Sequence, residues 1–128
     1  MSTQTIERTT LSNLVYNEPY ARKVIPFIRG DYYADRRERI VFEEIVKFVE
    51  KYNSQPTSET LSIELDNRKD LSDEDFKSVV DIVETLSNAD VDMQWLVDTT
   101  EKWCKDRAVH NAILNGICLL YTSPSPRD

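Results

Sequence analysis

The stretch WLVDTTEKWCKDRAVHNAILNGI, residues 95–117, decides the fold, because it carries the longest uninterrupted helical pattern in the chain. With a short lead-in it predicts a helix from about Asp92 to Ile117. At about 100° per residue, one narrow arc of that helix collects Leu96, Thr100, Trp103, Arg107, His110 and Leu114. A second flank, at Val97, Cys104 and Ala108, widens the apolar surface. We therefore expect two neighbours for this helix, either both in the chain's own core or one in a partner chain.

The residues after this helix break its pattern at once. CLLYTSPSPRD, residues 118–128, contains Pro124 and Pro126, which cannot continue a helix. The string resembles the in-frame translation of a transposase-type sequencing adapter, so we interpret it as a cloning or sequencing artefact and exclude it from the fold. A genuine Ser/Pro tail is the alternative. On the first interpretation the natural chain is cut near Ile117, and residues 1–117 form one truncated domain.

Composition predicts one mostly helical domain. Of the 128 residues, 40% are hydrophobic and 30% charged, and only two are glycines. No apolar run approaches the roughly 18 residues of a membrane span, and the N-terminus lacks the basic-then-apolar order of a signal peptide. We expect a cytoplasmic protein without membrane contact. Of the two cysteines, Cys118 belongs to the excluded string at residues 118–128, and a lone Cys104 on a helix indicates a reducing compartment.

The net charge disfavours binding of nucleic acid by this chain. The formal net charge is −7, and removing Arg127 and Asp128 with the tail leaves it unchanged. Binding of phosphate groups requires the opposite sign. An acidic domain can still belong to a DNA-handling protein if its own task is to contact other protein subunits.

Shorter patterns predict five more helices, and hence an all-α, compact bundle of about six. Their approximate ranges are Thr5–Tyr16, Pro19–Ile28, Asp35–Tyr52, a helix capped by Thr57 or Ser58 and ending near Asn67, and one from Ser72 through about Leu86. In the third, Val41, Phe42, Ile45 and Tyr52 are expected inward, with Glu43 and Glu44 outward. Gly30 is expected to cap the end of the second.

The sequence contains no motif typical of catalysis or cofactor binding. Glycine occurs only at positions 30 and 116, so a glycine-rich phosphate loop is impossible. His110 is the sole histidine and lies about 120° around the helix from Cys104, so the two would not converge on a metal. We expect His110 to be a core or interface residue, and we assign no catalytic, cofactor-binding or metal-binding residue. Arg107 either lays its stem along the core or forms a bidentate pair with a carboxylate.

Several local strings resemble the N-terminal domain of DnaB-type replicative DNA helicases, most closely those of T-even-like tailed phages. They run in the family's order across about residues 8–117. The strings are Asp31-Tyr32-Tyr33, the helix from Phe42 to Tyr52, Pro56 followed by the helix of Leu61 and Leu65, Trp95-Leu96-Val97, Thr100-Glu101-Lys102, Arg107-Ala108 and Asn111-Ala112.

The resemblance implies a non-catalytic collar domain. In this family a six-membered ring surrounds single-stranded DNA, and a separate RecA-like motor domain binds ATP and Mg²⁺ and hydrolyses the nucleotide. The helical N-terminal domains associate through a helical hairpin and help to recruit primase, and possibly a helicase loader. The last helix here would be the first arm of that hairpin, and the protein would act in the cytoplasm of an infected bacterial host cell.

The apolar surplus of the last helix would then bury against the same helix of a neighbouring subunit. We predict weak self-association with Trp103 near the contact. The candidate subunit interface comprises Leu96, Thr100, Trp103, Arg107, His110, Asn111 and Leu114. The alternative is a small acidic phage adaptor or inhibitor that binds a host factor or mimics DNA. Basic residues interspersed among the acidic ones on most helices disfavour a DNA mimic.

Overall fold

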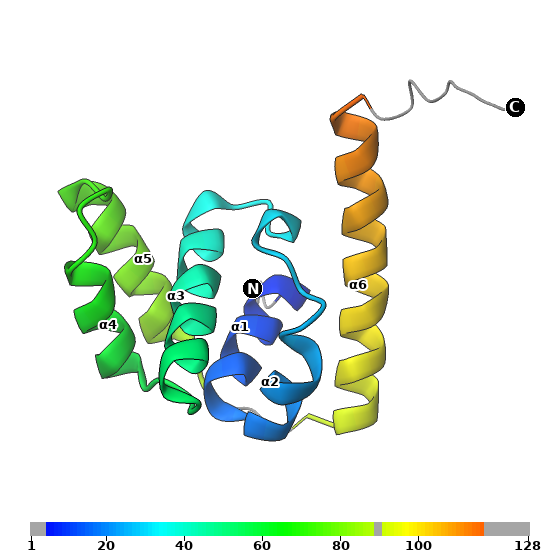
Figure 1. Ribbon diagram of the computed structural model, residues 1–128, viewed down its shortest axis with the longest axis horizontal. Helices are drawn as coiled ribbons and strands as arrows, with labels where there is room; N and C mark the ends of the chain where they lie inside the picture. The colour runs from blue at the N-terminus through cyan, green and yellow to red at the C-terminus, as the bar shows by residue number, and fades with distance from the viewer. Residues whose placement is uncertain (1–4, 89–90, 117–128) are drawn as a thin grey trace, which may run out of the picture.

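A computed structural model describes residues 5–88 and 91–116 (Figure 1). The string interpreted as an adapter, and the proposed cut at Ile117, lie outside these residues. In the described ranges the chain forms six α-helices, one short 3-10 helix and no strand, which confirms the all-α prediction. The elements are α1 (Ile6–Tyr16), α2 (Glu18–Val24), η1 (Gly30–Tyr32), α3 (Arg36–Tyr52), α4 (Ser58–Asp66), α5 (Asp73–Thr85) and α6 (Met93–Leu114).

Each α-helix begins after a short polar side chain that accepts a hydrogen bond from a backbone N–H of the first turn. Such side chains satisfy donors that have no partner inside the helix. The N-cap residues are Thr5, Asn17, Asp35, Thr57, Ser72 and Asp92. The cap of α4 is therefore Thr57, the first of the two predicted alternatives.

Two turns differ from the sequence prediction. α2 ends at Val24 and not at Ile28. Gly30 starts η1 instead of capping a helix, and Gly116 is the glycine with a positive φ, at +74°. The expected C-cap role of Gly30 was therefore wrong. A non-glycine residue, Asn53, also adopts a left-handed φ of 55°, at the end of α3.

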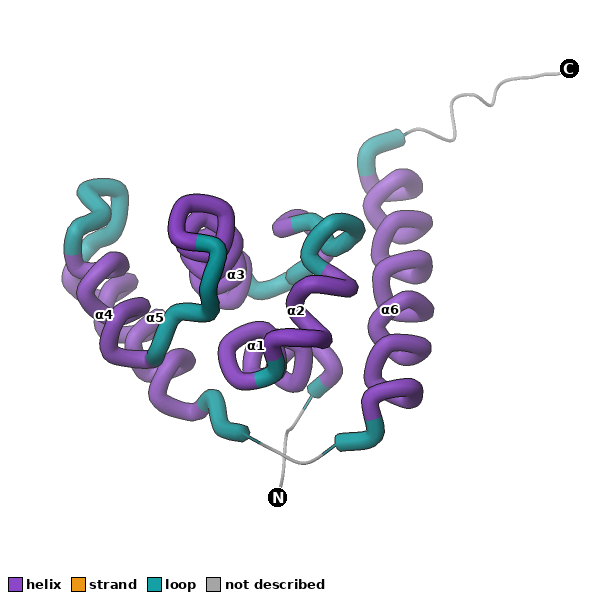
Figure 2. Tube along the Cα trace, turned by 60° about the horizontal axis from the view of Figure 1, so that its bottom comes forward, coloured by secondary structure: helices purple, strands orange, loops and turns teal. Residues whose placement is uncertain are grey.

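α4 and α5 lie on one side of the molecule, α3, α1 and α2 lie in the middle, and α6 lies on the other side (Figures 1 and 2). α4 packs on α5, both pack on α3, and α3 packs on α1. α6 contacts α1, α2 and η1, on the opposite side of the molecule from α4 and α5. Its C-terminal end extends past the other helices (Figure 1). Two surfaces far from one another are therefore exposed, one on α6 and one on α4 and α5.

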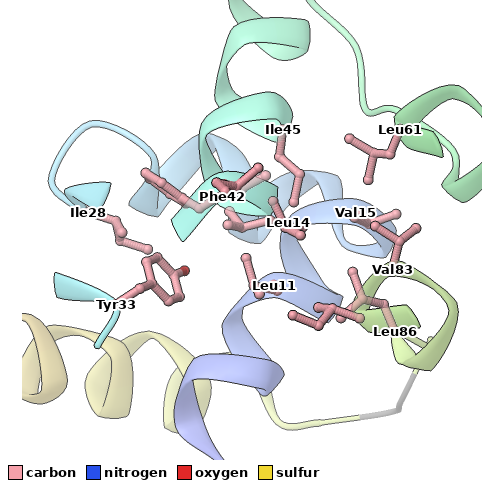
Figure 3. Close-up of a cluster of buried hydrophobic side chains, with 14 of the residues drawn as sticks. Leu11, Leu14, Val15, Ile28, Tyr33, Phe42, Ile45, Leu61, Val83 and Leu86 are labelled. Carbon is pink, nitrogen blue, oxygen red and sulfur yellow. The ribbon is translucent and has the colours of Figure 1, made fainter. Parts of the chain in front are cut away.

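All six α-helices contribute buried side chains to the hydrophobic core, part of which Figure 3 shows. Val41, Phe42 and Ile45 of α3 are buried, as predicted. Glu44, predicted to face solvent, is only 3% exposed, and its carboxylate lies 3.1 Å from the guanidinium of Arg68. Tyr52, predicted inward, is 52% exposed. The correction at Glu44 shows that a cation from another segment allows a carboxylate to lie on the inner side of α3.

A buried hydrogen bond joins α2 to α6. The Tyr20 hydroxyl lies 2.7 Å from Thr100 Oγ1, and both residues are fully buried. Thr100 Oγ1 itself donates to the carbonyl of Leu96 at 2.7 Å. The phenol is therefore the donor to the threonine oxygen. Burial raises the pKa of Tyr20 further above neutral pH, so the phenol is protonated and can donate.

This direction of donation predicts unequal effects of two substitutions. Thr100→Val should lower the free energy of unfolding by about 1–3 kcal/mol, because it leaves the Tyr20 phenol buried without an acceptor. Tyr20→Phe should cost less, since Thr100 keeps its bond to the Leu96 carbonyl. The double variant should resemble Tyr20→Phe. Urea titration followed by tryptophan fluorescence measures all three, and equal losses from the two single variants would contradict the assignment.

Candidate interaction surface on the last helix

The two halves of α6 differ in their exposure. In the first half Leu96 and Thr100 are fully buried, and Trp103 and Cys104 are 7% and 6% exposed. The large apolar residues of the second half are exposed to solvent. Exposure is 61% for Val109, 62% for Ile113 and 69% for Leu114. The first half of the predicted inward arc is therefore buried within the described chain, whereas His110 and Leu114 of the second half are exposed.

Trp103 is enclosed by aromatic rings of the same chain. Its ring centroid lies 5.0 Å from that of Tyr33 and 6.2 Å from that of Tyr32, both in edge-to-face geometry. The indole Nε1 is buried and has no hydrogen-bond partner among the described residues, so van der Waals contact holds this side chain. Trp103 is therefore covered by the core of its own chain, and its expected position near a contact with another subunit stays a prediction.

Two polar side chains of α6 bind the strap, defined here as residues 29–33. Arg107 Nε donates to the carbonyl of Tyr32 at 2.7 Å, and Asn111 Nδ2 donates to the carbonyl of Asp31 at 2.7 Å. Neither of the two predicted placements of the Arg107 side chain describes it fully. The side chain is half-buried, as in the first, but its guanidinium is held by a backbone carbonyl and not by a carboxylate.

The seven residues predicted as a subunit interface fall into three groups. Leu96, Thr100 and Trp103 are buried in the core, and Arg107 and Asn111 bind the strap. His110 and Leu114 are exposed, so His110 is not a core residue. Contact with another subunit is not observable in a single chain, and the interface stays a prediction. Leu96, Thr100 and Trp103 have almost no exposed surface left for a contact with another subunit.

A different apolar face of α6 was not predicted from the sequence. Trp95 is 52% exposed although it immediately precedes the fully buried Leu96. Trp95 and Ile113 are separated by about five turns, so they lie on the same side of the helix. We call Trp95, Val109 and Ile113, with the residues between them on that side, the outer face of α6. The helical pattern contained this signal, but the inward arc has more apolar members.

A hollow of about 290 Å³ lies beside α6. Its lining includes Phe27, Tyr32, Cys104 and Ala108, with Glu101 and Lys105 at the polar side. Burial raises the pKa of the Cys104 thiol to about 11, so the thiol stays protonated at neutral pH and is a poor nucleophile. Burial also raises the pKa of Tyr33, whose hydroxyl lies 2.9 Å from Thr10 Oγ1. These shifts are typical of a packed core.

Residues 5–88 and 91–116 contain no cluster of histidine, cysteine or carboxylate side chains able to hold a metal ion. None of the helices that the structure describes is long and apolar enough to cross a membrane. The candidate site is a surface of exposed apolar side chains on α6, whose other side packs against α1, α2 and η1.

Comparison with known proteins relates the chain to DnaB-like replicative helicases. The chain is similar to the DnaB-like replicative helicase of Enterobacteria phage T4, with 29% identity over 102 residues. The match covers 80% of this chain and 21% of the helicase, so the chain spans about a fifth of the length of that relative. No protein-family model matches the chain.

The bond between Arg107 and the strap can be tested by substitution. Arg107→Met keeps the aliphatic stem but removes the donor, and we expect it to lower the free energy of unfolding by about 1 kcal/mol. Lys105→Met is the control, since Lys105 is exposed on the same helix, and it should change stability by less than about 0.5 kcal/mol. Urea unfolding compares the two variants. Equal stability of Arg107→Met and the unchanged protein would show that the bond contributes nothing.

Proposed function

We propose that this chain is the N-terminal collar domain of a DnaB-like replicative helicase and that it holds helicase subunits together. The similarity to the helicase of phage T4 supports the link to replication. The order of the local strings, from Asp31-Tyr32-Tyr33 to Asn111-Ala112, supports the N-terminal position. The observation that carries the proposal of subunit association is the pattern of side chains along the outer face of α6.

That face is apolar at both ends and charged in the middle. Trp95 and Ile113 lie roughly 27 Å apart along the helix. Between them, Lys102 Nζ lies 3.1 Å from Asp106 Oδ2, and these two side chains are 79% and 65% exposed. Salt bridges this exposed contribute little to the stability of a single helix. The positions of these two charges are more important for a second helix that packs against this face, because its own charges can pair with them.

The pattern is self-complementary in an antiparallel pair. Residues 95 and 113 are equally far from position 104, and so are residues 102 and 106. When a second copy of α6 is turned end over end about that position, Trp95 of each copy meets Ile113 of the other. In the same register Lys102 of each copy faces Asp106 of the other. One two-fold axis therefore satisfies both kinds of contact, as an isologous interface requires.

In the parent helicase we propose that such pairs are the units of a hexameric ring, and that α6 is the first arm of a helical hairpin. Primase, and possibly a helicase loader, would bind the collar that these units form. Single-stranded DNA, ATP and Mg²⁺ would bind parts of the helicase other than this chain. The net charge of −7 supports a role other than binding phosphate groups.

Self-association through the outer face can be measured by sedimentation velocity over a concentration series. We expect reversible dimers, and we expect Trp95→Ser and Ile113→Ser each to raise the dissociation constant about tenfold, because each removes apolar area from the contact. Ile63→Ser is the matched control, since Ile63 of α4 is exposed to the same 62% as Ile113. It should leave the dissociation constant unchanged. A monomer at every concentration would refute the proposed pairing.

The register is tested separately by exchanging charges. Lys102→Glu places two acidic side chains opposite each other in the pair, and we expect it to weaken dimerisation about threefold to tenfold at low salt. The double variant Lys102→Glu with Asp106→Lys should restore dimerisation, because the opposite charges again face each other. Thermal unfolding of the monomer controls for changes within one helix. If the double variant dimerises as weakly as the single one, the antiparallel register is wrong even if Trp95 lies in the contact.

A further inference from the structure

Ile63 is a further exposed apolar side chain, and it lies in a hollow on the other side of the molecule, where α4 and α5 pack together. Ile63 is 62% exposed, whereas its neighbours Leu61 and Leu65 on α4 are fully buried. The hollow has a volume of about 330 Å³. Its lining residues are Ser58, Glu59, Ser62, Ile63 and Glu84. We call this the α4–α5 groove.

The groove lies in the most acidic part of the chain. Residues 58–85 contain nine acidic and three basic residues, whereas the rest of the chain contains 14 acidic and 13 basic residues. Nearly all of the net charge of −7 therefore belongs to this segment. The sequence argument that basic residues are interspersed among the acidic ones holds for the other helices and not for this pair.

Arg68 of this segment and Arg36 of α3 are already paired with other carboxylates. Arg68 lies 2.7 Å from Asp70 and 3.1 Å from Glu44, and Arg36 lies 3.1 Å from Asp75. In contrast, the two carboxylates beside Ile63 in the groove, those of Glu59 and Glu84, form no ion pair with any residue that the structure describes. The groove thus offers an apolar contact between two uncompensated negative charges.

We propose that the α4–α5 groove binds an amphipathic, positively charged helix of another protein. A groove between two helices with an apolar centre fits the apolar side of such a helix. Lysine or arginine residues on either side of its apolar residues would reach Glu59 and Glu84, and the charge of the segment would steer the encounter. This proposal is independent of the pairing through α6.

Charge also argues against other occupants. Nucleic acid and anionic lipid surfaces carry the same sign as the groove and are repelled. In a second copy of this chain, the basic run at residues 36–39 is already engaged internally. Arg36 pairs with Asp75 at 3.1 Å, and Arg37 pairs with Asp35 at 3.0 Å. The chemistry therefore favours a different, basic protein.

A synthetic peptide of about 15 residues, with leucine on one face of the helix and lysine on the other, serves as the probe. Titration into the full chain, followed by backbone amide chemical shifts and calorimetry, should locate binding at residues 58–66 and 73–85. We expect Ile63→Ser to weaken binding about tenfold, because the apolar anchor is lost. Glu59→Gln combined with Glu84→Gln should weaken it about threefold to tenfold and reduce its salt dependence.

Two matched controls separate the groove from general attraction between a basic peptide and an acidic protein. Ile113→Ser removes an equally exposed isoleucine from α6, and Glu50→Gln removes an exposed carboxylate from α3. Both should bind the peptide as the unchanged chain does. The proposal fails if Ile63→Ser has no effect, if Ile113→Ser weakens binding equally, or if no binding occurs at roughly millimolar peptide. Binding of single-stranded DNA or anionic vesicles at the groove would also overturn it.

Discussion

The packing of α6 against Tyr20, Tyr32 and Tyr33 is the constraint on which the surfaces of this domain depend. These aromatic residues come from a segment far from α6 in the sequence, and they cover Thr100 and Trp103. Once that contact forms, the rotation of α6 about its own axis is fixed. Leu96, Thr100 and Trp103 of the inward arc are buried within the chain, and the residues about a quarter of a turn away form the outer face. What α6 can bind is therefore decided by what its own domain has already covered.

Helical periodicity predicted the direction of the side chains of α6 but not their depth. Leu96 and Leu114 are separated by about five turns and lie on the same side of the helix. Leu96 is fully buried, but Leu114 is 69% exposed because the end of α6 extends past the other helices. A single sequence cannot reveal where the neighbouring helices stop. For this reason the predicted interface combined core residues with truly exposed ones.

The polar contacts were the least predictable part of the structure. Arg107 and Asn111 bind backbone carbonyls of the strap, and a backbone carbonyl has no side-chain signature that a sequence pattern could reveal. The burial of Glu44 was equally unpredictable, because it depends on Arg68, which comes from the loop after α4. In contrast, the helix starts at Thr57 and Ser72 were predictable, since an N-cap acts on its own helix within three residues.

The placement of α6 and of the α4–α5 groove on opposite sides of the molecule has a consequence for assembly. α3 and α1 lie between them, so a helix bound in the groove would not compete with pairing through the outer face of α6. The two surfaces also differ in chemistry. The outer face of α6 is self-complementary in charge, with Lys102 and Asp106 on one side of the helix, whereas the groove carries one sign of charge around Ile63. A self-complementary face suits a second copy of the same chain, and a face of one sign suits a different protein, because identical charges cannot pair across a two-fold axis.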